Sequence, residues 1–412
     1  MACHRSPRPH PQIQTSEQGA GVARRISPRP HPQIEDGAGA TRRCCRRASL
    51  PDDDDMIREI LLRLPPQPSS LPRAAAVYKR WRGLVADPRF LRELRAHHRK
   101  PPLLGVFLRK NRCGGVAFSP ILGPPDRVPR QRFKLRGCSS AWDGYNLVDC
   151  RHGLVLLKNR SPTVVVCDPV TGQQHRVAVP PEHTTHFFNG AVLCAATDQG
   201  HVHGSCHSSP FKLVLMSWYT TADRPLARVY SSQTDAWSNP ILTDAPCEIS
   251  RKPVVLVGNR LYWLSKGYAT LVEFDMGEHS LTLIGGPPVT DRILFGNCQI
   301  IQAEDGALGY AILSKTHFQV WQRSIGVHGV TTWVLSKTIE LHTILGPPSP
   351  QDEGIHVQLL GHDEDDIVFL CYYGSVYMVQ LKTMQSRKLD ESHSTRDLYF
   401  PFKSFYTSGL RI

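Results

Sequence analysis

The sequence lacks the segments that mark membrane-spanning and secreted proteins. Its longest apolar candidates, such as residues 367–373, have the length of a strand, whereas a membrane-spanning helix needs about 20 apolar residues. The first ten residues, MACHRSPRPH, contain no apolar core of a signal peptide. We therefore expect neither secretion nor a membrane partner.

Cysteine pairs with metal-site or redox spacing are also missing. The twelve cysteines are scattered singly apart from Cys44 and Cys45, and no C-x-x-C pair occurs. This usage favours reduced thiols, and a location in the cytoplasm or nucleus, over a disulfide framework. Lipidation of Cys44 and Cys45 beside arginines is a minor alternative.

Motifs of the common enzyme classes are absent too. There is no G-x-S-x-G elbow, no phosphate-binding loop, no dinucleotide fingerprint after a strand and no H-E-x-x-H. We expect a protein without intrinsic catalysis and without a cofactor. The remaining enzyme hypothesis is a hydrolase whose scattered Ser, His and Asp residues converge only in the fold.

The positive charge is concentrated at the N-terminal end. Residues 1–48 hold nine arginines and three acids, residues 49–100 hold eleven basic and seven acidic side chains, and only +3 of the net +13 remains beyond residue 100. The larger part of the chain thus offers no basic stripe for phosphates, and we expect no nucleic-acid partner.

Residues 1–48 have a composition too rich in proline and arginine to build a core. The segment SPRPHPQI at 6–13 returns at 27–34 without a structural period. We expect a disordered basic arm. Its run RRCCRR at 42–47 is a candidate nuclear-import or anionic-surface patch, with a solvated linker or an organellar transit peptide as alternatives.

Residues 49–100 carry strong helix signals. The acidic run 52–55 suits the first turn of a helix that Pro65 and Pro66 end. Ser69 and Ser70 suit the start of a second helix through residue 85, and Asp87-Pro88 that of a third. Apolar residues recur at helical spacing in all three. We predict a three-helix module that leaves apolar surface for a partner.

This module resembles an F-box of the plant type. The matching segments are LPDD at 50–53, EILLRLP at 59–65, VYKRWR at 77–82 and DPRF at 87–90, whereas Asp54, Asp55 and Tyr78 depart from the family pattern. The resemblance implies docking on the Skp adaptor of a cullin-RING ubiquitin ligase. Carried over by position, the adaptor-binding residues are Leu50, Pro51, Ile57, Ile60, Leu61, Leu64, Pro65, Val77, Trp81 and Leu84.

From residue 101 to the end, the pattern changes to short apolar or alternating runs separated by turn residues, which predicts an all-β domain. The predicted strands are 103–108, 153–157, 164–167, 175–179, 191–195, 213–218, 226–231, 254–257, 260–264, 270–275, 280–284, 307–313, 318–322, 333–339, 357–361, 367–371 and 375–380. Short turns between them predict antiparallel hairpins.

Proline-rich exits return about every forty to fifty residues, the period of propeller blades. They lie at 179–181, 238–240, 286–288 and 346–348, and about six blades fit. Several phrases, such as HGLVLL at 152–157, VCDPVTG at 166–172 and GNRLYW at 258–263, resemble the F-box-associated β-propeller-like domain of plants. The predicted organisation is therefore a 1–48 arm, a 49–100 F-box module and a 101–412 propeller-like domain, an α+β multidomain chain.

A group of histidines and cysteines contains the ligand types that suit zinc. Its members are His183, His186, Cys194, His201, His203, Cys206 and His207. Their spacing matches no compact zinc module, so we predict exposed loop histidines and no metal site. The acidic run 363–366 lacks the spacing of a calcium loop and is predicted to be a solvated turn.

The function predicted from these observations is that of a substrate-recognition subunit of a Skp-cullin-F-box ubiquitin ligase. The module would dock on the Skp adaptor and, through it, cullin, while the propeller-like domain holds an unknown target protein. We place the target in two long connections, 180–189 and 196–210. The predicted contacts are His183, His186, Phe187, Phe188, His201, His203 and His207. A propeller scaffold or regulatory binding protein outside a ligase is the alternative.

Overall fold

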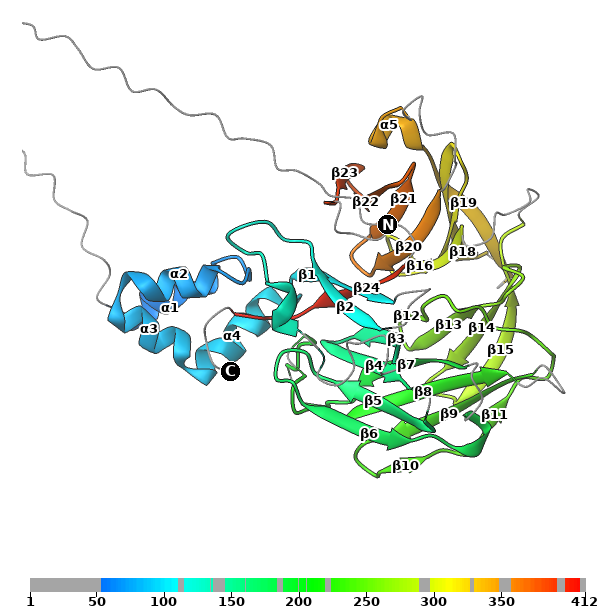
Figure 1. Cartoon of the computed structure of the whole chain (residues 1–412), viewed down its shortest axis with the longest axis horizontal. Coiled ribbons are helices and arrows are strands. Elements are labelled where there is room, and N and C mark those ends of the chain that lie inside the picture. The colour runs from blue at the N-terminus through cyan, green and yellow to red at the C-terminus, as the bar shows by residue number, and fades with distance from the viewer. Residues whose placement is uncertain are drawn as a thin grey trace, which may run out of the picture. The chain divides into compact units, whose positions relative to one another are not determined.

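The computed structural model describes most of the chain beyond the N-terminal arm (Figure 1). The described residues are 53–109, 115–133, 135, 145–159, 161–183, 188–198, 200–204, 206–218, 224–288, 297–326, 330–347, 357–390 and 397–407. The predicted arm, together with Leu50 and Pro51, lies outside them.

Four helices open the described part. They are α1 (Asp54–Leu62), α2 (Ser70–Val77), α3 (Lys79–Ala86) and α4 (Pro88–His98). Asp53 caps α1 by accepting the Asp55 N–H at 3.0 Å, and Asp87 caps α4 by accepting the Arg89 N–H at 2.9 Å. The Asp87 cap was predicted from the sequence, whereas for α1 the sequence predicted only an acidic first turn in 52–55. Ser69 is the N-cap residue of α2, as expected, but its side chain makes no capping hydrogen bond.

The prediction of three helices is wrong at Tyr78. Its backbone is extended, with φ −149° and ψ 139°, so the expected second helix is divided into α2 and α3. Neither glycine nor proline marks this break in the sequence. As a result, Val77 and Tyr78 leave the apolar stripe in which their spacing placed them and are exposed.

Within the described residues, twenty-four strands form six antiparallel sheets, the blades of a propeller (Figure 1). Blade 1 contains β1 (Leu103–Arg109), β2 (Val116–Pro120) and β24 (Leu398–Lys403). Blade 2 contains β3 (Asn146–Arg151), β4 (Leu154–Lys158), β5 (Thr163–Cys167) and β6 (Gln174–Ala178). Blade 3 contains β7 (Phe188–Cys194), β8 (Phe211–Trp218), β9 (Pro225–Ser231), β10 (Ala236–Trp237) and β11 (Ile241–Leu242).

The remaining blades follow in chain order. Blade 4 contains β12 (Val255–Val257), β13 (Arg260–Leu264), β14 (Thr270–Asp275) and β15 (Ser280–Gly285). Blade 5 contains β16 (Cys298–Gln302), β17 (Leu308–Leu313), β18 (His317–Ile325) and β19 (Thr331–Glu340), followed by the helix α5 (Leu341–Leu345). Blade 6 contains β20 (Gln358–Asp363), β21 (Ile367–Tyr372), β22 (Ser375–Gln380) and β23 (Gln385–Lys388). Two 3-10 turns, η1 (Arg130–Phe133) and η3 (Pro181–His183), lie between strands.

Each blade is buried on both faces, which explains why several strands are continuously apolar. In β5, Val165 and Cys167 pack into the core shared with blade 1, while Val164 and Val166 pack into the core shared with blade 3. Because successive side chains of a strand point to opposite faces, one strand contributes to two cores. Three predicted proline-rich exits follow β6, β15 and α5, where the chain leaves blades 2, 4 and 5. The fourth, 238–240, lies between β10 and β11 and therefore within blade 3.

The ring is closed by the end of the chain. Strand β24 pairs antiparallel with β1, so blade 1 is built from both ends of the propeller sequence. Phe400 and Phe402 of β24 pack toward blade 2, whereas Tyr399 packs toward blade 6. Closure removes the exposed sheet edge that an open arrangement would leave.

All seventeen predicted strands overlap strands of the structure, but seven strands were not predicted. The missed strands are β2, β3, β10, β11, β16, β23 and β24. The short helix α5 was not predicted either. The fold class, a small helical module followed by a large all-β propeller, is confirmed.

Candidate functional site

The helical module has its own core, and part of the predicted adaptor-binding set lies in it. Ile57 and Leu61 are fully buried in this core together with Val85 and Phe90. Their burial leaves no surface for a partner. Ile57 and Leu61 therefore support the helices from inside, a correction to their predicted role as contacts.

Other predicted docking residues lie at the surface of the module. Ile60 is 39% exposed and Val77 is 63% exposed, and Pro65 is exposed as well. Leu64, Trp81 and Leu84 are half-buried against the core. The structure also exposes Met56 and Tyr78, two large side chains that the prediction did not include.

The exposed apolar residues are grouped by contacts between helices. Met56 and Ile60 are four residues apart on α1 and hence share one face of it. Arg80, at the start of α3, pairs with Asp54 in the first turn of α1 at 2.6 Å. This ion pair places Arg80, two residues after Tyr78, near the first turn of α1. We call Met56, Ile60, Val77 and Tyr78 the exposed apolar face.

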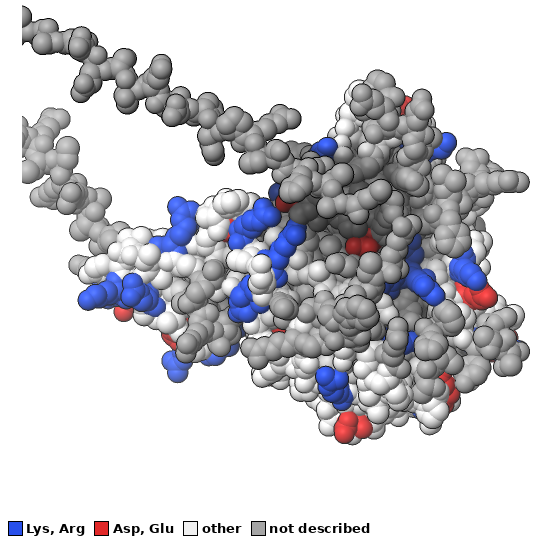
Figure 2. Space-filling view, in the orientation of Figure 1, with Lys and Arg blue, Asp and Glu red and all other residues white. Residues whose placement is uncertain are grey.

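Charged side chains surround this face. Arg63 pairs with Glu59 one turn along α1, and Arg58 reaches Glu93 of α4 at 3.3 Å. Figure 2 shows Lys and Arg side chains gathered over the helical module on the side in view. An apolar patch bordered by charges is the pattern of a protein-binding surface.

The predicted target-binding residues do not form one surface. His183 is fully buried beside Phe188 and Trp237, and neither of its ring nitrogens has a hydrogen-bond partner among the described residues. Burial lowers the pKa of His183 to about 4, so the ring is neutral at pH 7. The expectation of an exposed His183 is wrong, because the turn η3 directs it into the protein.

The other members are divided among different environments. Phe188 belongs to β7 and is half-buried, with the Lys158 ammonium 3.9 Å from its ring centroid. His207 pairs with the buried Asp168 at 2.7 Å. His186 and Phe187 lie outside the described residues. The connection 180–189 is therefore shorter than predicted, since Phe188 and Asn189 already belong to a strand.

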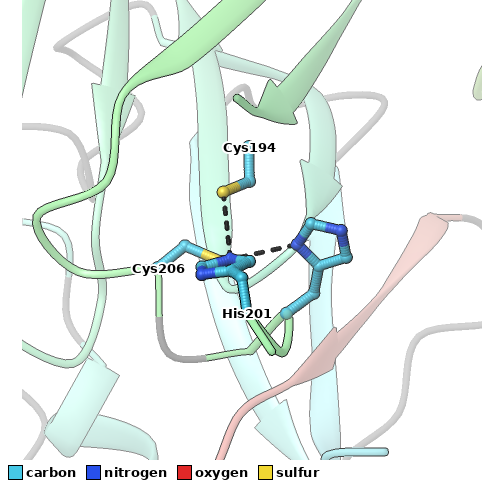
Figure 3. Close-up of side chains that lie close together, drawn as sticks. Cys194, His201 and Cys206 are labelled. Atoms are coloured by element: carbon cyan, nitrogen blue, oxygen red, sulfur yellow. Dashed lines mark hydrogen bonds between the residues drawn. The ribbon is translucent and has the colours of Figure 1, made fainter. Parts of the chain in front are cut away.

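His201 and His203 lie in the β7–β8 connection, which comprises residues 195–210, close to Cys206 of the same connection and to Cys194 at the end of β7. The ligand atoms of Cys194, His201, His203 and Cys206 all lie within 4.8 Å of one another. We call these four residues the Cys2His2 cluster. Figure 3 shows Cys194 and Cys206 directed toward the His201 ring. Four of the seven candidate ligands are thus brought together, His183 and His207 lie elsewhere, and His186 is outside the described residues.

A cavity of about 800 Å³ lies where the inner strands of several blades end. Its lining comes from β3, β12, β16, β20 and β24 and from the glycine-flanked residues 200–204 of the β7–β8 connection. The cavity is therefore central to the propeller, and the connection that carries His201 and His203 borders it.

Charged groups of the cavity are paired across blades. Arg151 of β3 contacts Asp149 at 3.5 Å and Glu364 of blade 6 at 3.2 Å, and it donates to the Val254 carbonyl at 3.0 Å. Lys403 of β24 contacts Asp363 at 2.6 Å. The acidic run 363–366 is a turn, as predicted, but its Asp363 is buried by Lys403 rather than solvated.

Lys252, which precedes the cavity-lining residues 253–256, and His362, which lines the cavity, have strongly shifted pKa values. Burial lowers the pKa of Lys252 to about 8, and its ammonium donates to the Leu359 carbonyl at 2.9 Å. Burial lowers the pKa of His362 to about 3, and its ring lies 2.9 Å from the Gln299 amide. The Lys252 contact connects the start of blade 4 to blade 6, and the His362 contact connects blade 5 to blade 6. The sequence offered little signal for them, because each is a single polar residue near an inner strand.

The pairing of these groups favours a structural role over catalysis. Arg151, Lys252 and Lys403 each contact a carboxylate or carbonyl group from a different part of the ring, and these contacts connect the blades. A small helical module with an exposed apolar face, joined to a six-bladed propeller, has the architecture of a binding protein.

Family models support this class for both parts of the chain. The F-box domain matches residues 48–93, and the β-propeller of F-box proteins described as AT5G49610-like matches residues 146–405. The second match covers more than half of the sequence. The chain belongs to the family of AT5G49610-like F-box β-propeller proteins, and this membership indicates a non-catalytic adaptor.

Comparisons with individual proteins give less evidence than the family models. No significant match was found among curated protein sequences. A functionally unknown protein from Desulfotomaculum acetoxidans DSM 771 is 9% identical, with a TM-score of 0.41 over 73% of this chain and 86% of that one. The extracellular domain of the putative one component system BT4673 from B. thetaiotaomicron is 13% identical, with a TM-score of 0.32 over 59% and 27%. In the described part of the chain, no helix has the length and apolar character to cross a membrane.

Proposed function

We propose that this protein is the substrate-recognition subunit of a Skp-cullin-F-box ubiquitin ligase. The observation that carries the proposal is the exposed apolar face on a helical module that matches the F-box, in a chain whose other large part is a propeller. The module docks on the Skp adaptor and thereby joins cullin. The propeller holds the target protein.

The work assigned to this subunit is positioning. Binding the adaptor at one end and the target at the other raises the effective concentration of target lysines near the conjugating enzyme. No residue of this chain has to make or break a bond in such a scheme. The role places the protein in the cytoplasm or nucleus, where its thiols stay reduced.

Adaptor capture tests the proposal directly. We expect the full chain to retain the Skp adaptor and cullin from an extract, and the double variant Leu50→Ala with Pro51→Ala to lose both. Residues that precede the first helix have little core to join, so circular dichroism should remain helical in the variant. Unchanged capture by the variant would remove these two residues from the interface. Failure of the full chain to capture any adaptor favours the alternative, a propeller scaffold that acts outside a ligase.

The target site is proposed on the β7–β8 connection rather than on the whole of 183–207. An exchange of 183–207 would delete β7, a strand of blade 3 that contacts blade 2. We therefore design the exchange for residues 196–209 alone, replaced by a short Gly-Ser linker. The backbone bond from Ala195 N to Pro210 O, 2.8 Å long, then still closes the hairpin.

The exchanged chain should lose proteins that the full chain captures through its propeller, while adaptor capture persists. The reason is that His203 is exposed on this connection, at the border of the central cavity. Quantitative mass spectrometry of the captured proteins measures the result. Identical recovery by both chains would place the target surface elsewhere on the propeller.

A further inference from the structure

The Cys2His2 cluster has a geometry that neither adaptor docking nor target capture explains. Its two sulfur and two imidazole groups come from the end of β7 and the connection that follows it, with the spacing Cys-x6-His-x-His-x2-Cys. Cys206 is buried, Cys194 and His201 are half-buried, and only His203 is exposed. Neither cysteine forms a disulfide bond in the structure.

The distances between ligand atoms fit a single tetrahedral ion. His201 Nε2 lies 3.3 Å from Cys194 Sγ and 3.4 Å from Cys206 Sγ, and His203 Nδ1 lies 3.7 Å from Cys206 Sγ. Around a tetrahedral zinc with ~2.3 Å bonds to sulfur and ~2.0 Å bonds to nitrogen, such atoms are ~3.5 Å apart. Three of the six distances between donors therefore already match the edges of a zinc tetrahedron, and all six are within 4.8 Å. Figure 3 shows the Cys194, His201 and Cys206 side chains of the cluster.

The backbone holds the two cysteines in place. Cys194 is the last residue of β7, and its partner Phe211 begins β8, so the pairing of these strands fixes the base of the connection. The Ala196 N–H lies 3.5 Å from Cys194 Sγ, an arrangement that suits a thiolate ligand. Opposite it, the Ser209 N–H donates to the Cys206 carbonyl at 3.2 Å.

The far end of the connection is fixed against blade 1. Gly204 has φ +96°, and its carbonyl accepts hydrogen bonds from Ser404 Oγ at 3.0 Å and Phe405 N at 3.1 Å. A Cβ at Gly204 would lie 2.6 Å from Pro101 Cγ, so only glycine fits. These contacts of Gly204 fix the bend that separates His203 from Cys206.

A second layer of contacts surrounds the donors. The His152 ring stacks on His203 with centroids 3.8 Å apart and an angle of 13° between planes. His152 Nδ1 also accepts the Cys194 N–H at 3.0 Å. Neighbouring side chains of this kind commonly orient metal-binding residues. Here His152 orients two of the four ligands, because it contacts the His203 ring and the backbone of Cys194.

We propose that Cys194, His201, His203 and Cys206 bind one Zn²⁺ in a closed, structural site. Two thiolates and two imidazoles are the ligand set of tetrahedral zinc, and four protein ligands leave no open position for substrate. The ion would cross-link the β7–β8 connection at the border of the cavity. This proposal departs from the sequence-based prediction of no metal, and it stands whether or not the protein joins a ligase.

The test is the metal content of the full chain, purified under reducing conditions without chelators. We expect one zinc per chain by elemental mass spectrometry. Replacing zinc by Co²⁺ should produce the visible bands of a tetrahedral site and sulfur-to-cobalt charge transfer, since two thiolates coordinate the ion. The variant Cys194→Ser with Cys206→Ser should lose the zinc and both spectral features.

A matched variant separates the cluster from other cysteines and histidines. Cys247→Ser with His279→Asn changes a half-buried free thiol and an imidazole outside the cluster, and it should keep one zinc per chain. His201→Asn, which keeps both cysteines, should shift the Co²⁺ spectrum or lose the metal. Zinc-free full chain, a Cys194–Cys206 disulfide in the reduced preparation, or zinc retained after both cysteines are replaced would each overturn the proposal.

Discussion

A chain that ends at Asp397 should lose the cooperative folding of the propeller. The deletion removes β24, whose Tyr399, Phe400 and Phe402 are all buried. Removing one buried Phe side chain costs ~3–5 kcal/mol, and a typical domain is stable by only ~5–15 kcal/mol. The loss of three such rings, together with the pairing to β1, should exceed the stability of the ring. Thermal unfolding and limited proteolysis measure this.

The matched control is a chain that ends at Thr407. It retains β24 and the contacts of Ser404 and Phe405 with Gly204, so we expect it to melt like the full chain. A cooperative, unshifted transition in the chain that ends at Asp397 would show that blade 1 does not depend on its closing strand.

A point variant tests the same closure without deleting residues. A Cβ at Gly361 would lie 2.3 Å from the Tyr399 carbonyl oxygen, at the contact between β20 and β24. Gly361→Ala therefore forces two blades apart, and we expect a loss of about 3 kcal/mol in the free energy of unfolding. Gly285→Ala is the control, because a Cβ there meets nothing within 4 Å.

Helix ends could be predicted from the sequence because their signals are local. The carboxylates of Asp53 and Asp87 satisfy free N–H groups two residues further on, and this requires no tertiary contact. The break at Tyr78 could not be predicted in this way. No cap, glycine or proline accompanies it, and Ala74, Trp81 and Val85 keep a helical spacing across it.

Strands next to short turns were predicted, whereas the closing strand was not. The β24 sequence LYFPFK contains Pro401, which argues against a strand when its neighbours are unknown. Its partner β1 begins almost 300 residues earlier in the chain. Such a pairing depends on the closure of the whole ring, which no local pattern encodes.

The candidate site was predicted in composition but not in arrangement. The histidines and cysteines were recognised as zinc-type ligands, yet their spacing resembles no compact module. The hairpin closed by Ala195 and Pro210 brings Cys194 and Cys206 together, and this closure depends on the register of β7 and β8. By the same argument, η3 buries His183, which was predicted to be an exposed histidine of a long connection.

Replacing Ile60 and Val77 together by aspartate should weaken adaptor binding at least about 100-fold. Both side chains belong to the exposed apolar face, so their replacement does not disturb the core of the module. In a complex, the new carboxylates would be buried in an apolar interface without partners, and a central contact of this kind contributes ~2 kcal/mol or more. Titration of the purified adaptor against the full chain measures the change.

The control carries the same chemical change on the propeller. Leu242 and Val334 are 53% and 52% exposed, and replacing both by aspartate should leave adaptor affinity unchanged. A third variant, Ile57→Asp, places the charge in the core of the module and should lose helicity together with binding. Loss of binding with retained helicity therefore identifies surface contact, and wild-type affinity of the Ile60 and Val77 double variant would exclude this face as the docking surface.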